Sequence, residues 1–230
     1  MNKVNFVSII LPTFNSEKTI AKCLISLLNQ SYKNFEIIIV DNYSTDNTIE
    51  IIKYFIQKQN KIKINLLFNK YKNLSLSLNI GIKAARGEYL LRMDSDDICL
   101  RDRIKISLKF LINNPKIQLV GSSVYLSTHK IKLKKIMPEN HNLIYSLMPF
   151  DNPFCHPTIM FHKNILRDVG NYNQSNDFSE DYDLWSRILI KYKAQNINKF
   201  LLNYNMSSNQ LSNKINKFKI EKLNNIQKFF

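Results

Sequence analysis

Three aspartates stand close together near the middle of the chain. Asp94, Asp96 and Asp97 fall within four residues, directly after the apolar stretch Glu88 to Met93. Their carboxylates repel one another, and a hard divalent cation such as Mn²⁺ or Mg²⁺ offsets that repulsion, because it takes oxygen ligands from carboxylates and substrate phosphates. An exposed acidic turn is the alternative, and an Asp-x-Asp triplet alone does not decide between the two.

Two further polar segments follow apolar runs near the start of the chain. They are Pro12 to Asn15 and Asp41 to Asp46. Ligands of open α/β sheets bind beyond the carboxyl ends of the strands, so we expect these segments and the aspartates at one edge. Asn47, with Glu50 three residues later, has the spacing of a capping box, which predicts a structural role for Asp46 and Asn47.

A later segment, Glu180 to Lys191, is predicted to be a helix with an acidic start. Acids in the first turn stabilise a helix through its dipole, and Asp183 stands four residues before Arg187, the spacing of an ion pair. We therefore assign Asp183 a structural role and keep Asp181 for chemistry. The apolar residues of this segment, Trp185 among them, are expected in the core.

The elements that must position these residues alternate along the first half of the chain. Strands are predicted at Val7–Leu11, Phe35–Val40, Lys63–Phe68, Glu88–Met93 and Ile117–Tyr125. Helices are predicted at Ile20–Leu28, Ile49–Ile56, Leu74–Ala85 and Arg101–Leu111. This alternation predicts an α/β fold: a single domain whose open, mostly parallel sheet is flanked by helices.

The second half is less regular. We expect a lysine-rich loop at Lys130 to Lys135 and an irregular passage from Pro138 to Pro157, then strands at Thr158–Phe161 and Ile197–Tyr204. The predicted organisation is a domain over 1–205, in two halves (1–125 and 126–205), and a basic tail over 206–230.

Composition excludes several kinds of site. The glycines number four and allow neither a Gly-x-Gly-x-x-Gly loop nor a Gly-Lys-Ser/Thr phosphate loop. The three cysteines lack a Cys-x-x-Cys pair and the four histidines lack His-Glu-x-x-His spacing, so a built-in zinc site is not expected. A nucleotide would therefore be held by carboxylates and a metal ion.

The net charge of +15 would suit nucleic acid, an anionic membrane or phosphorylated substrates. Eight lysines and one acid stand between Lys191 and the end, away from the acidic segments. We expect no nucleic-acid partner, because acids occupy the predicted strand ends. Lys214 to Phe230 has weak helical amphipathicity that favours peripheral contact with an anionic membrane, and ordinary packing explains it equally well. Without a membrane span or a signal peptide, the chain is expected in the cytoplasm.

Six segments together, in this order, resemble family 2 inverting glycosyltransferases of the GT-A fold. They are Ser8–Asn15, Asp41–Asp46, Ala85–Tyr89, Asp94–Asp97, His156–Met160 and Glu180–Trp185. Six ordered motifs are far more specific than any one of them. The resemblance implies transfer of a sugar from a nucleotide-diphosphate donor, usually a UDP-sugar, to a glycan or lipid-linked acceptor in surface glycan synthesis.

The same resemblance makes 1–125 the nucleotide-binding half and 126–205 the acceptor half, and it implies roles for individual residues. Asp41 would accept a hydrogen bond from the base. The rest of the nucleotide pocket would be lined by Pro12, Thr13, Phe14 and Glu17.

At the reacting end, the resemblance makes Asp94 and Asp96 the Asp-x-Asp pair. Asp96 would be the direct ligand of Mn²⁺ or Mg²⁺, Asp94 would also contact the donor, and Asp181 would be the catalytic base.

One departure from the family pattern is Tyr204-Asn-Met-Ser207, where relatives commonly have Tyr-Arg-x-His. Lys72, Arg101 or Arg103 would have to compensate for the missing basic pair, or activity would be reduced or lost. The alternatives are therefore a degenerate sugar-nucleotide binder without activity and a nucleotidyltransferase, although the latter would want a glycine-rich loop after the first strand.

Overall fold

The computed structural model describes residues 4–128, 131–175 and 179–206. Its first half alternates strands and helices: β1 (Val7–Thr13), α1 (Ile20–Leu28), β2 (Phe35–Asp41), α2 (Thr48–Lys58), β3 (Lys63–Phe68), α3 (Leu74–Ala84), β4 (Tyr89–Arg92), β5 (Ile98–Cys99) and α4 (Arg103–Asn113). The second half contains β6 (Ile117–Ser127), β7 (Lys132–Lys135), α5 (His141–Leu147), β8 (Met160–His162), α6 (Leu166–Val169), α7 (Glu180–Lys191) and β9 (Lys193–Asn205), with short 3₁₀ turns at His156–Thr158 and Lys163–Ile165.

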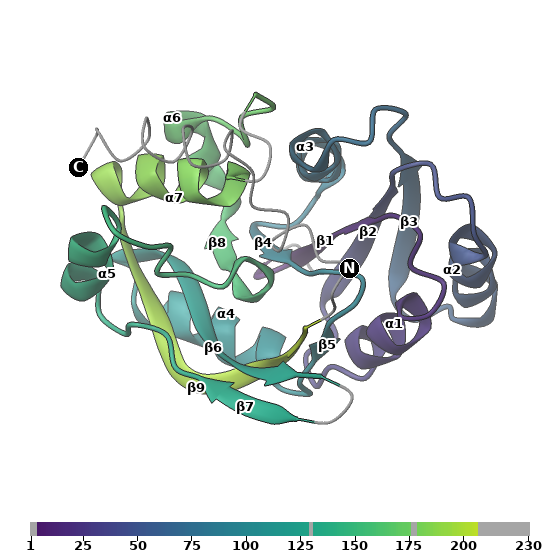
Figure 1. The fold of residues 1–230 in the computed structure, drawn as a ribbon, viewed down its shortest axis with the longest axis horizontal. Coiled ribbons are helices and arrows are strands. Elements are labelled where there is room, and N and C mark those ends of the chain that lie inside the picture. Colours follow the sequence, from purple (N-terminus) through teal and green to yellow (C-terminus); the bar gives the residue numbers. More distant parts are fainter. Residues whose placement is uncertain (1–3, 129–130, 176–178, 207–230) are drawn as a thin grey trace.

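The described strands form one curved sheet in the order β3-β2-β1-β4-β8-β6-β9-β5, and β7 pairs with β6 (Figure 1). Strands β3, β2, β1 and β4 run parallel, as does the long β6–β9 pair, while β8, β5 and β7 pair antiparallel with their neighbours. The predicted α/β fold with a mostly parallel sheet flanked by helices is confirmed.

The two faces of the sheet carry separate cores because successive side chains of a strand point to opposite sides. Val7, Ile9 and Leu11 of β1 pack with α1, α2 and α4, whereas Ile10 packs with α3 and the group α5 to α7. Trp185 is fully buried in the second core, as predicted. Among the described residues, no helix combines the length and apolar character that a bilayer crossing requires.

The segment Ala85–Tyr89 contacts residues of β1 and β2 and leads into β4. Arg86 forms a 2.8 Å ion pair with fully buried Glu36, whose other oxygen accepts a 2.8 Å hydrogen bond from Ser8 Oγ. The Gly87 amide donates to the same hydroxyl at 2.8 Å. A Cβ on Gly87 would lie 2.5 Å from the Ser8 nitrogen, so only glycine fits this approach of two backbones. This family-like motif therefore positions the strands.

Three expectations about the second half were wrong. Lys132–Lys135, expected in a loop, is β7, because a charged strand at a sheet edge pairs with β6 on one side only. The passage expected to be irregular contains α5, which Asn140 caps by accepting a 2.9 Å hydrogen bond from the Leu143 amide. Strand β9 starts at Lys193, four residues before the predicted start.

Candidate active site

The strand order places a topological switch point between β1 and β4. Chain connections leave β1 toward β2 and β3 on one side and reach β4 on the other, and ligands of such sheets bind at this switch point. Phe14 follows β1, and Asp94 stands two residues after the end of β4. A 2.8 Å hydrogen bond between the hydroxyls of Ser16 and Ser95 joins the two loops.

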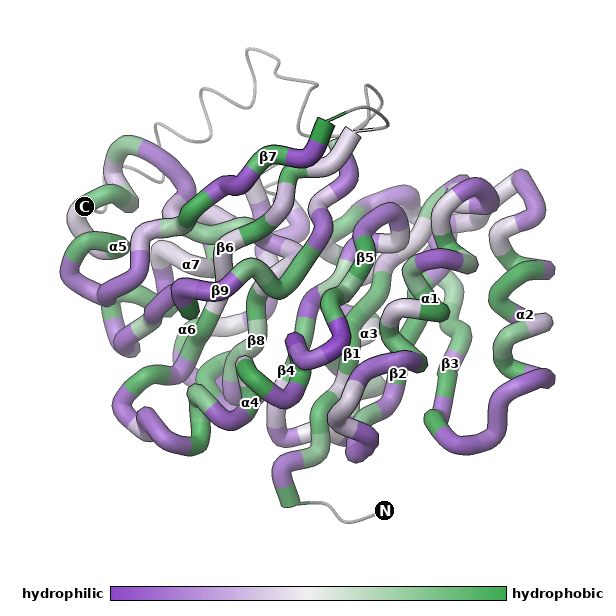
Figure 2. The backbone as a smooth tube through the Cα atoms, turned by 90° about the horizontal axis from the view of Figure 1, so that it is seen from below, coloured by the Kyte–Doolittle hydropathy of each residue, from purple (hydrophilic) through white to green (hydrophobic). Residues whose placement is uncertain are grey.

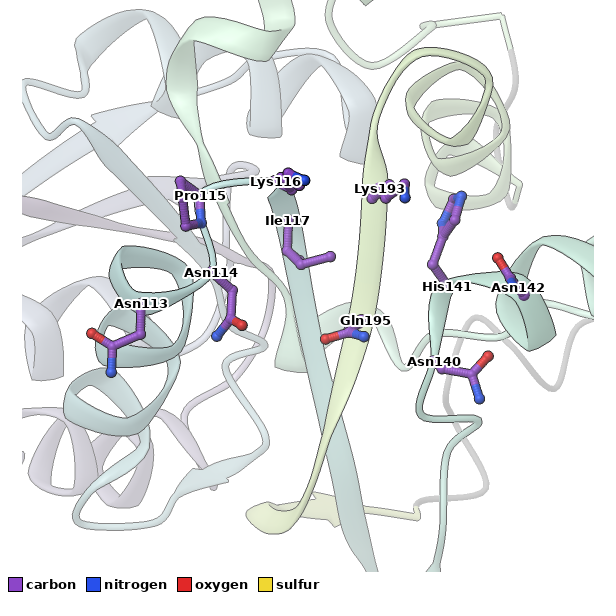
Figure 3. A pocket seen from close by; sticks show the side chains of 10 residues that line it. All are labelled: Asn113, Asn114, Pro115, Lys116, Ile117, Asn140, His141, Asn142, Lys193 and Gln195. Atoms are coloured by element: carbon purple, nitrogen blue, oxygen red, sulfur yellow. The ribbon is translucent and has the colours of Figure 1, made fainter.

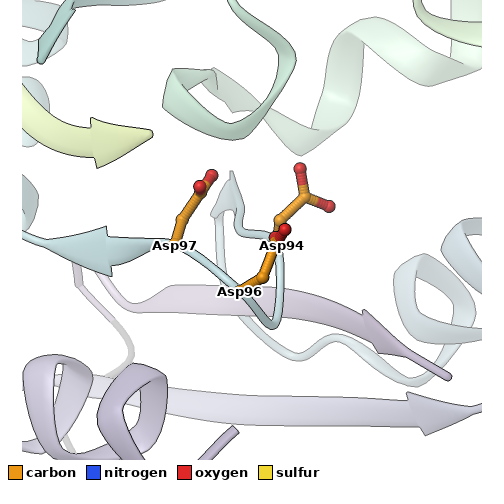
Figure 4. Close-up of side chains that lie close together, drawn as sticks. All are labelled: Asp94, Asp96 and Asp97. Atoms are coloured by element: carbon orange, nitrogen blue, oxygen red, sulfur yellow. The ribbon is translucent and has the colours of Figure 1, made fainter. Parts of the chain in front are cut away.

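Asp94, Asp96 and Asp97 converge in the loop between β4 and β5, and Figure 4 shows their carboxylates close together. One oxygen from each lies within 4.8 Å of the others. Burial, followed by the charge of Asp94, raises the pKa of Asp96 to about 6. Burial and both neighbours also raise the pKa of Asp97. Such shifts express repulsion that a bound divalent cation would relieve.

Asn205, at the end of β9, contacts the aspartate cluster. Its backbone amide donates to Asp97 Oδ1 at 2.8 Å, and its side chain forms a hydrogen bond to Asp96 that opposes the rise in pKa. Asp97 Oδ2 is buried with no partner within the described part of the chain. An oxygen in this condition fits a metal ligand or the neighbour of one. Asn205, noted in the sequence as a departure, thus touches the cluster, while Ser207 lies outside the described residues.

Arg92, the last residue of β4, is the buried cation of the site. It forms an ion pair with Asp94, and although burial acts to lower the pKa of Arg92, the charge of Asp94 keeps it above its ordinary value. The sequence analysis missed Arg92. The signal was available, because Arg92 is a charged residue that ends an apolar strand two positions before the first aspartate.

Glu180, at the start of α7, faces inward. His156 Nδ1 lies 3.8 Å from Glu180 Oε1, and His156 Nε2 shares a 2.9 Å hydrogen bond with the Tyr172 hydroxyl. Burial, then the charge of Asp181, raises the pKa of Glu180 to about 8. Burial and Arg92 lower the pKa of His156 well below its ordinary value. Near neutral pH, Glu180 is therefore mainly protonated and His156 is neutral.

Asp181 is the more accessible acid of this pair. It is half-buried, its Oδ2 accepts a 2.8 Å hydrogen bond from the Asn152 side chain, and its Oδ1 accepts one from the Tyr182 amide. Burial raises the pKa of Tyr172, and the charges of Asp181 and Asp94 add to that rise. The two carboxylates therefore lie near the same phenol, although they are 87 positions apart in the sequence.

The expected nucleotide residues gather at the ends of β1 and β2. Thr13 and Asp41 are register partners, and Phe14, 42% exposed, has Lys72 Nζ 4.8 Å from its ring centroid. Asp41 is fully buried and accepts hydrogen bonds from the Ser44 amide at 2.9 Å and the Ser44 hydroxyl at 2.5 Å. Each of its oxygens can accept a second bond. Pro12 and Thr13 are buried, so Phe14 and Lys72 form the open face.

The predicted capping box at α2 was wrong. The Asn47 side chain does not cap the helix; it donates to Glu17 Oε2 at 3.0 Å, and its amide donates to the same oxygen at 3.1 Å. Asp46 caps instead, accepting from the Thr48 amide at 3.0 Å. Glu17, expected in the nucleotide pocket, therefore also ties the β1–α1 loop to the start of α2.

Arg103 cannot compensate for the missing basic pair. Its side chain is fully buried and donates a 2.7 Å hydrogen bond to the Arg92 carbonyl. Asp183 and Arg187 form the predicted ion pair, at 2.6 Å. Cys23, Cys99 and Cys155 are free thiols; the first two are buried and Cys155 is half-buried.

Two surface hollows lie apart from the aspartates. One, of about 490 Å³, opens at the starts of β6 and β9 and is lined mainly by amide and lysine side chains such as Asn113, Asn140, Lys116 and Lys193 (Figure 3). The other, of about 450 Å³, lies beside Tyr125 and Phe200. Neither includes an aspartate of the cluster or Asp181. We therefore locate the site by its converging charged side chains, which can do chemistry, and not by the size of a hollow.

Comparison with known proteins agrees with this geometry. The family model for glycosyl transferase family 2 matches residues 8–170. The O-antigen biosynthesis glycosyltransferase WbnJ of Escherichia coli is 32% identical over 208 residues, which cover 87% of this chain and 80% of that relative.

Two solved structures share the fold. S. aureus TarS 1-349 in complex with UDP-GlcNAc has a TM-score of 0.74 at 21% identity, covering 92% of this chain and 61% of that one. The mannosyltransferase PcManGT from Pyrobaculum calidifontis, in complex with GDP-Man and Mn²⁺, has a TM-score of 0.70 at 18% identity, covering 88% of this chain and 57% of that one. This chain thus spans less than two thirds of either solved chain. On the family match and the sequence identity, the chain belongs to glycosyl transferase family 2.

Proposed function

We propose that this chain transfers a sugar, with inversion, from a nucleotide-diphosphate donor to an acceptor hydroxyl in the synthesis of a surface polysaccharide or lipo-oligosaccharide. The observation that carries the proposal is that Asp94, which belongs to the aspartate cluster and pairs with Arg92, and Asp181 both lie near Tyr172. The aspartate cluster can hold a metal ion that binds the diphosphate, and Asp181 can accept the proton of the acceptor hydroxyl.

The residues fit a divalent cation. Asp94 and Asp96 would hold Mn²⁺ or Mg²⁺, with Asp97 behind them, because hard cations take carboxylate oxygens and Asp97 Oδ2 has no protein partner within the described residues. When bound, such an ion would offset the negative charge that develops on the departing diphosphate. Arg92 forms an ion pair with Asp94 and so holds that side chain at the site.

Asp181 would accept the acceptor proton. In a single displacement, the acceptor oxygen forms a bond to the anomeric carbon while the bond from that carbon to the diphosphate oxygen breaks, and the hydroxyl proton passes to the Asp181 carboxylate. One displacement inverts the anomeric configuration. Glu180 is less suited to this role, because it is buried against His156 and mainly protonated near neutral pH.

The donor side would use the ends of β1 and β2. Phe14 offers an aromatic face, Lys72 a positive charge beside it and Asp41 an acceptor for a base N–H. We infer a UDP-sugar donor, by analogy with the UDP-GlcNAc bound to TarS, although PcManGT binds GDP-Man. The transferred group would be a hexose or an N-acetylhexosamine.

A screen of nucleotide sugars with the purified chain tests the proposal. We expect release of nucleoside diphosphate that requires Mn²⁺ or Mg²⁺, stops with chelator and is lost in Asp181→Asn. Release from no UDP-sugar, or release unaffected by chelator, would contradict it.

A degenerate binder without activity is the second candidate, favoured by the neutral Asn205 beside the aspartates. It predicts donor binding with no release in any acceptor mixture. A nucleotidyltransferase would instead consume a sugar phosphate and release pyrophosphate, and the family match gives it no support.

We further propose a cytoplasmic location and no nucleic-acid partner, and retain the prediction that the basic tail, 206–230, contacts the membrane. All of that tail except Met206 lies outside the described residues. Salt-sensitive binding to duplex DNA would contradict the second of these proposals.

A further inference from the structure

Strand β7 lies at the periphery of the molecule in both views, and its sequence, Lys-Leu-Lys-Lys, is flanked by Ile131 and Ile136 (Figures 1 and 2). Ile131 and Leu133 are each 57% exposed, and Ile136 is 69% exposed. Leu133 is the register partner of Leu126, so it lies on the face of β6 that carries Leu126. Large aliphatic side chains thus project into solvent beside an edge strand.

Lys132 and Lys134 lie on the face of β7 opposite Leu133, because side chains alternate along a strand. Lys132 Nζ lies 4.1 Å from the centroid of the Tyr125 ring, and Lys134 Nζ lies 5.5 Å from that of Phe200. The two rings stack with their centroids 4.7 Å apart. Lys132, Lys134 and Lys135 are all exposed, and no acid occurs between residues 128 and 138. The segment therefore contains no acid of its own to pair with these lysines.

This edge adjoins the candidate active site. Lys132 is the partner of Ser127, and Ser127 is the partner of Asn205. Adjacent strands lie about 4.8 Å apart, so the start of β7 is roughly 10 Å from Asn205. The amide of Asn205 in turn binds Asp97. A surface held by β7 would therefore lie beside the aspartates.

We propose that β7, with the flanking Ile131 and Ile136, docks on an anionic lipid bilayer. The aliphatic side chains would enter the headgroup region, and the lysines would extend toward lipid phosphates, because their stems are apolar and their ends charged. An acceptor carried on a lipid would then be presented close to the site. Docking itself needs no donor and no transfer.

Protection of the edge and pairing with a second copy fit these residues less well than a lipid surface does. Lysines on an edge strand discourage pairing with another chain, but that role leaves three exposed aliphatic residues unexplained. Pairing of β7 with β7 of a second copy would bring lysines against lysines, which is unfavourable without anions between them. A negatively charged lipid surface satisfies both the aliphatic side chains and the lysines.

Co-sedimentation of the full chain with vesicles tests the proposal. We expect binding to vesicles of phosphatidylcholine that contain about 30% phosphatidylglycerol, and at least roughly tenfold weaker binding to phosphatidylcholine alone. The variants K132S/K134S/K135S and I131S/L133S should each bind the anionic vesicles at least about tenfold more weakly than the parent. Matched controls are K105S/K109S, with exposed lysines on α4, and Ile190→Ser, at a position that is 57% exposed on α7.

Separate outcomes identify separate failures. Parent-like binding by both β7 variants, or no binding by the parent, overturns the proposal. In a further variant, Lys214, Lys217, Lys219 and Lys222 are changed to serine. If only this variant loses vesicle binding, the binding belongs to the tail and the proposal for β7 is wrong. Stronger binding to soluble polyanions than to vesicles would likewise overturn it. Donor turnover with a soluble acceptor should stay unchanged in the β7 variants, so failure of docking is distinguishable from failure of the transferase proposal.

Discussion

The role of Asp181 can be separated from that of Glu180 by a pair of isosteric substitutions. Asp181→Asn removes the carboxylate that we propose as the proton acceptor, while an amide of the same size can still contact Asn152. Glu180→Gln changes a buried acid whose pKa is already raised to about 8 and which is mainly protonated near neutral pH. A neutral glutamine differs little from that protonated acid in charge.

The two variants should therefore differ strongly in rate. General-base catalysis contributes about 10²–10⁴-fold, so Asp181→Asn should lower turnover by that factor, or roughly 3–5 kcal/mol in activation free energy. Glu180→Gln should retain turnover within about tenfold, because no ionised group is removed. Donor affinity should stay near that of the parent in both, since the residues proposed to hold the donor follow β1, β2 and β4.

The assay measures release of nucleoside diphosphate at saturating donor and acceptor, and donor affinity by calorimetry with Mn²⁺. A second readout is electrostatic: the charge of Asp181 contributes to the raised pKa of Glu180, after burial, so Asp181→Asn should lower the pKa of Glu180. Carboxyl resonances of labelled glutamate would report that change. The reasoning is refuted if Glu180→Gln is the inactive variant, or if Asp181→Asn loses donor affinity in step with rate.

Three further predictions concern the metal site, pH and the sheet. Asp96→Asn should abolish metal-stimulated turnover while its circular dichroism spectrum stays that of the parent, and Asp94→Asn should have a milder effect. If Asp96→Asn keeps the parent rate and still requires the metal, the ligand assignment is wrong. In the metal-free protein, the pKa of Asp96 is raised to about 6 and that of Glu180 to about 8, so both acids bind more protons in the folded state than in the unfolded state. The lowered pKa of His156 acts the other way below its ordinary value of 6.5, so the free energy of unfolding should fall as pH rises from about 6.5 to 8. Urea titrations at both pH values measure this change in the free energy of unfolding. Saturating Mn²⁺ should remove the part of the change that is due to Asp96. A free energy of unfolding that rises with pH would contradict the prediction. Gly87→Ala should cost about 1–3 kcal/mol of unfolding free energy, because the new methyl group meets the backbone of Ser8 and Phe6. Gly81→Ala should cost less, because its methyl meets the Ile10 side chain instead, and equal losses would argue against backbone crowding at Gly87.

Local sequence patterns determined several of the helices and strands. Lys63–Phe68 and Glu180–Lys191 have the predicted bounds, because apolar alternation and helical spacing depend on near neighbours in the chain. The Asp183–Arg187 ion pair also follows from spacing along one helix. The placement of polar segments at one sheet edge followed from the rule for parallel strands.

Tertiary contacts decided the rest. Whether residues 132–135 form a loop or a strand depended on the distant β6, and the burial of Arg103 depended on the carbonyl of Arg92. The resemblance favoured Asp181 over its neighbour Glu180 as the base, but only the packing of Glu180 against His156 shows which acid is buried and protonated and which is accessible. Desolvation and contacts between segments far apart in the chain create that difference, and neither is encoded in residue spacing.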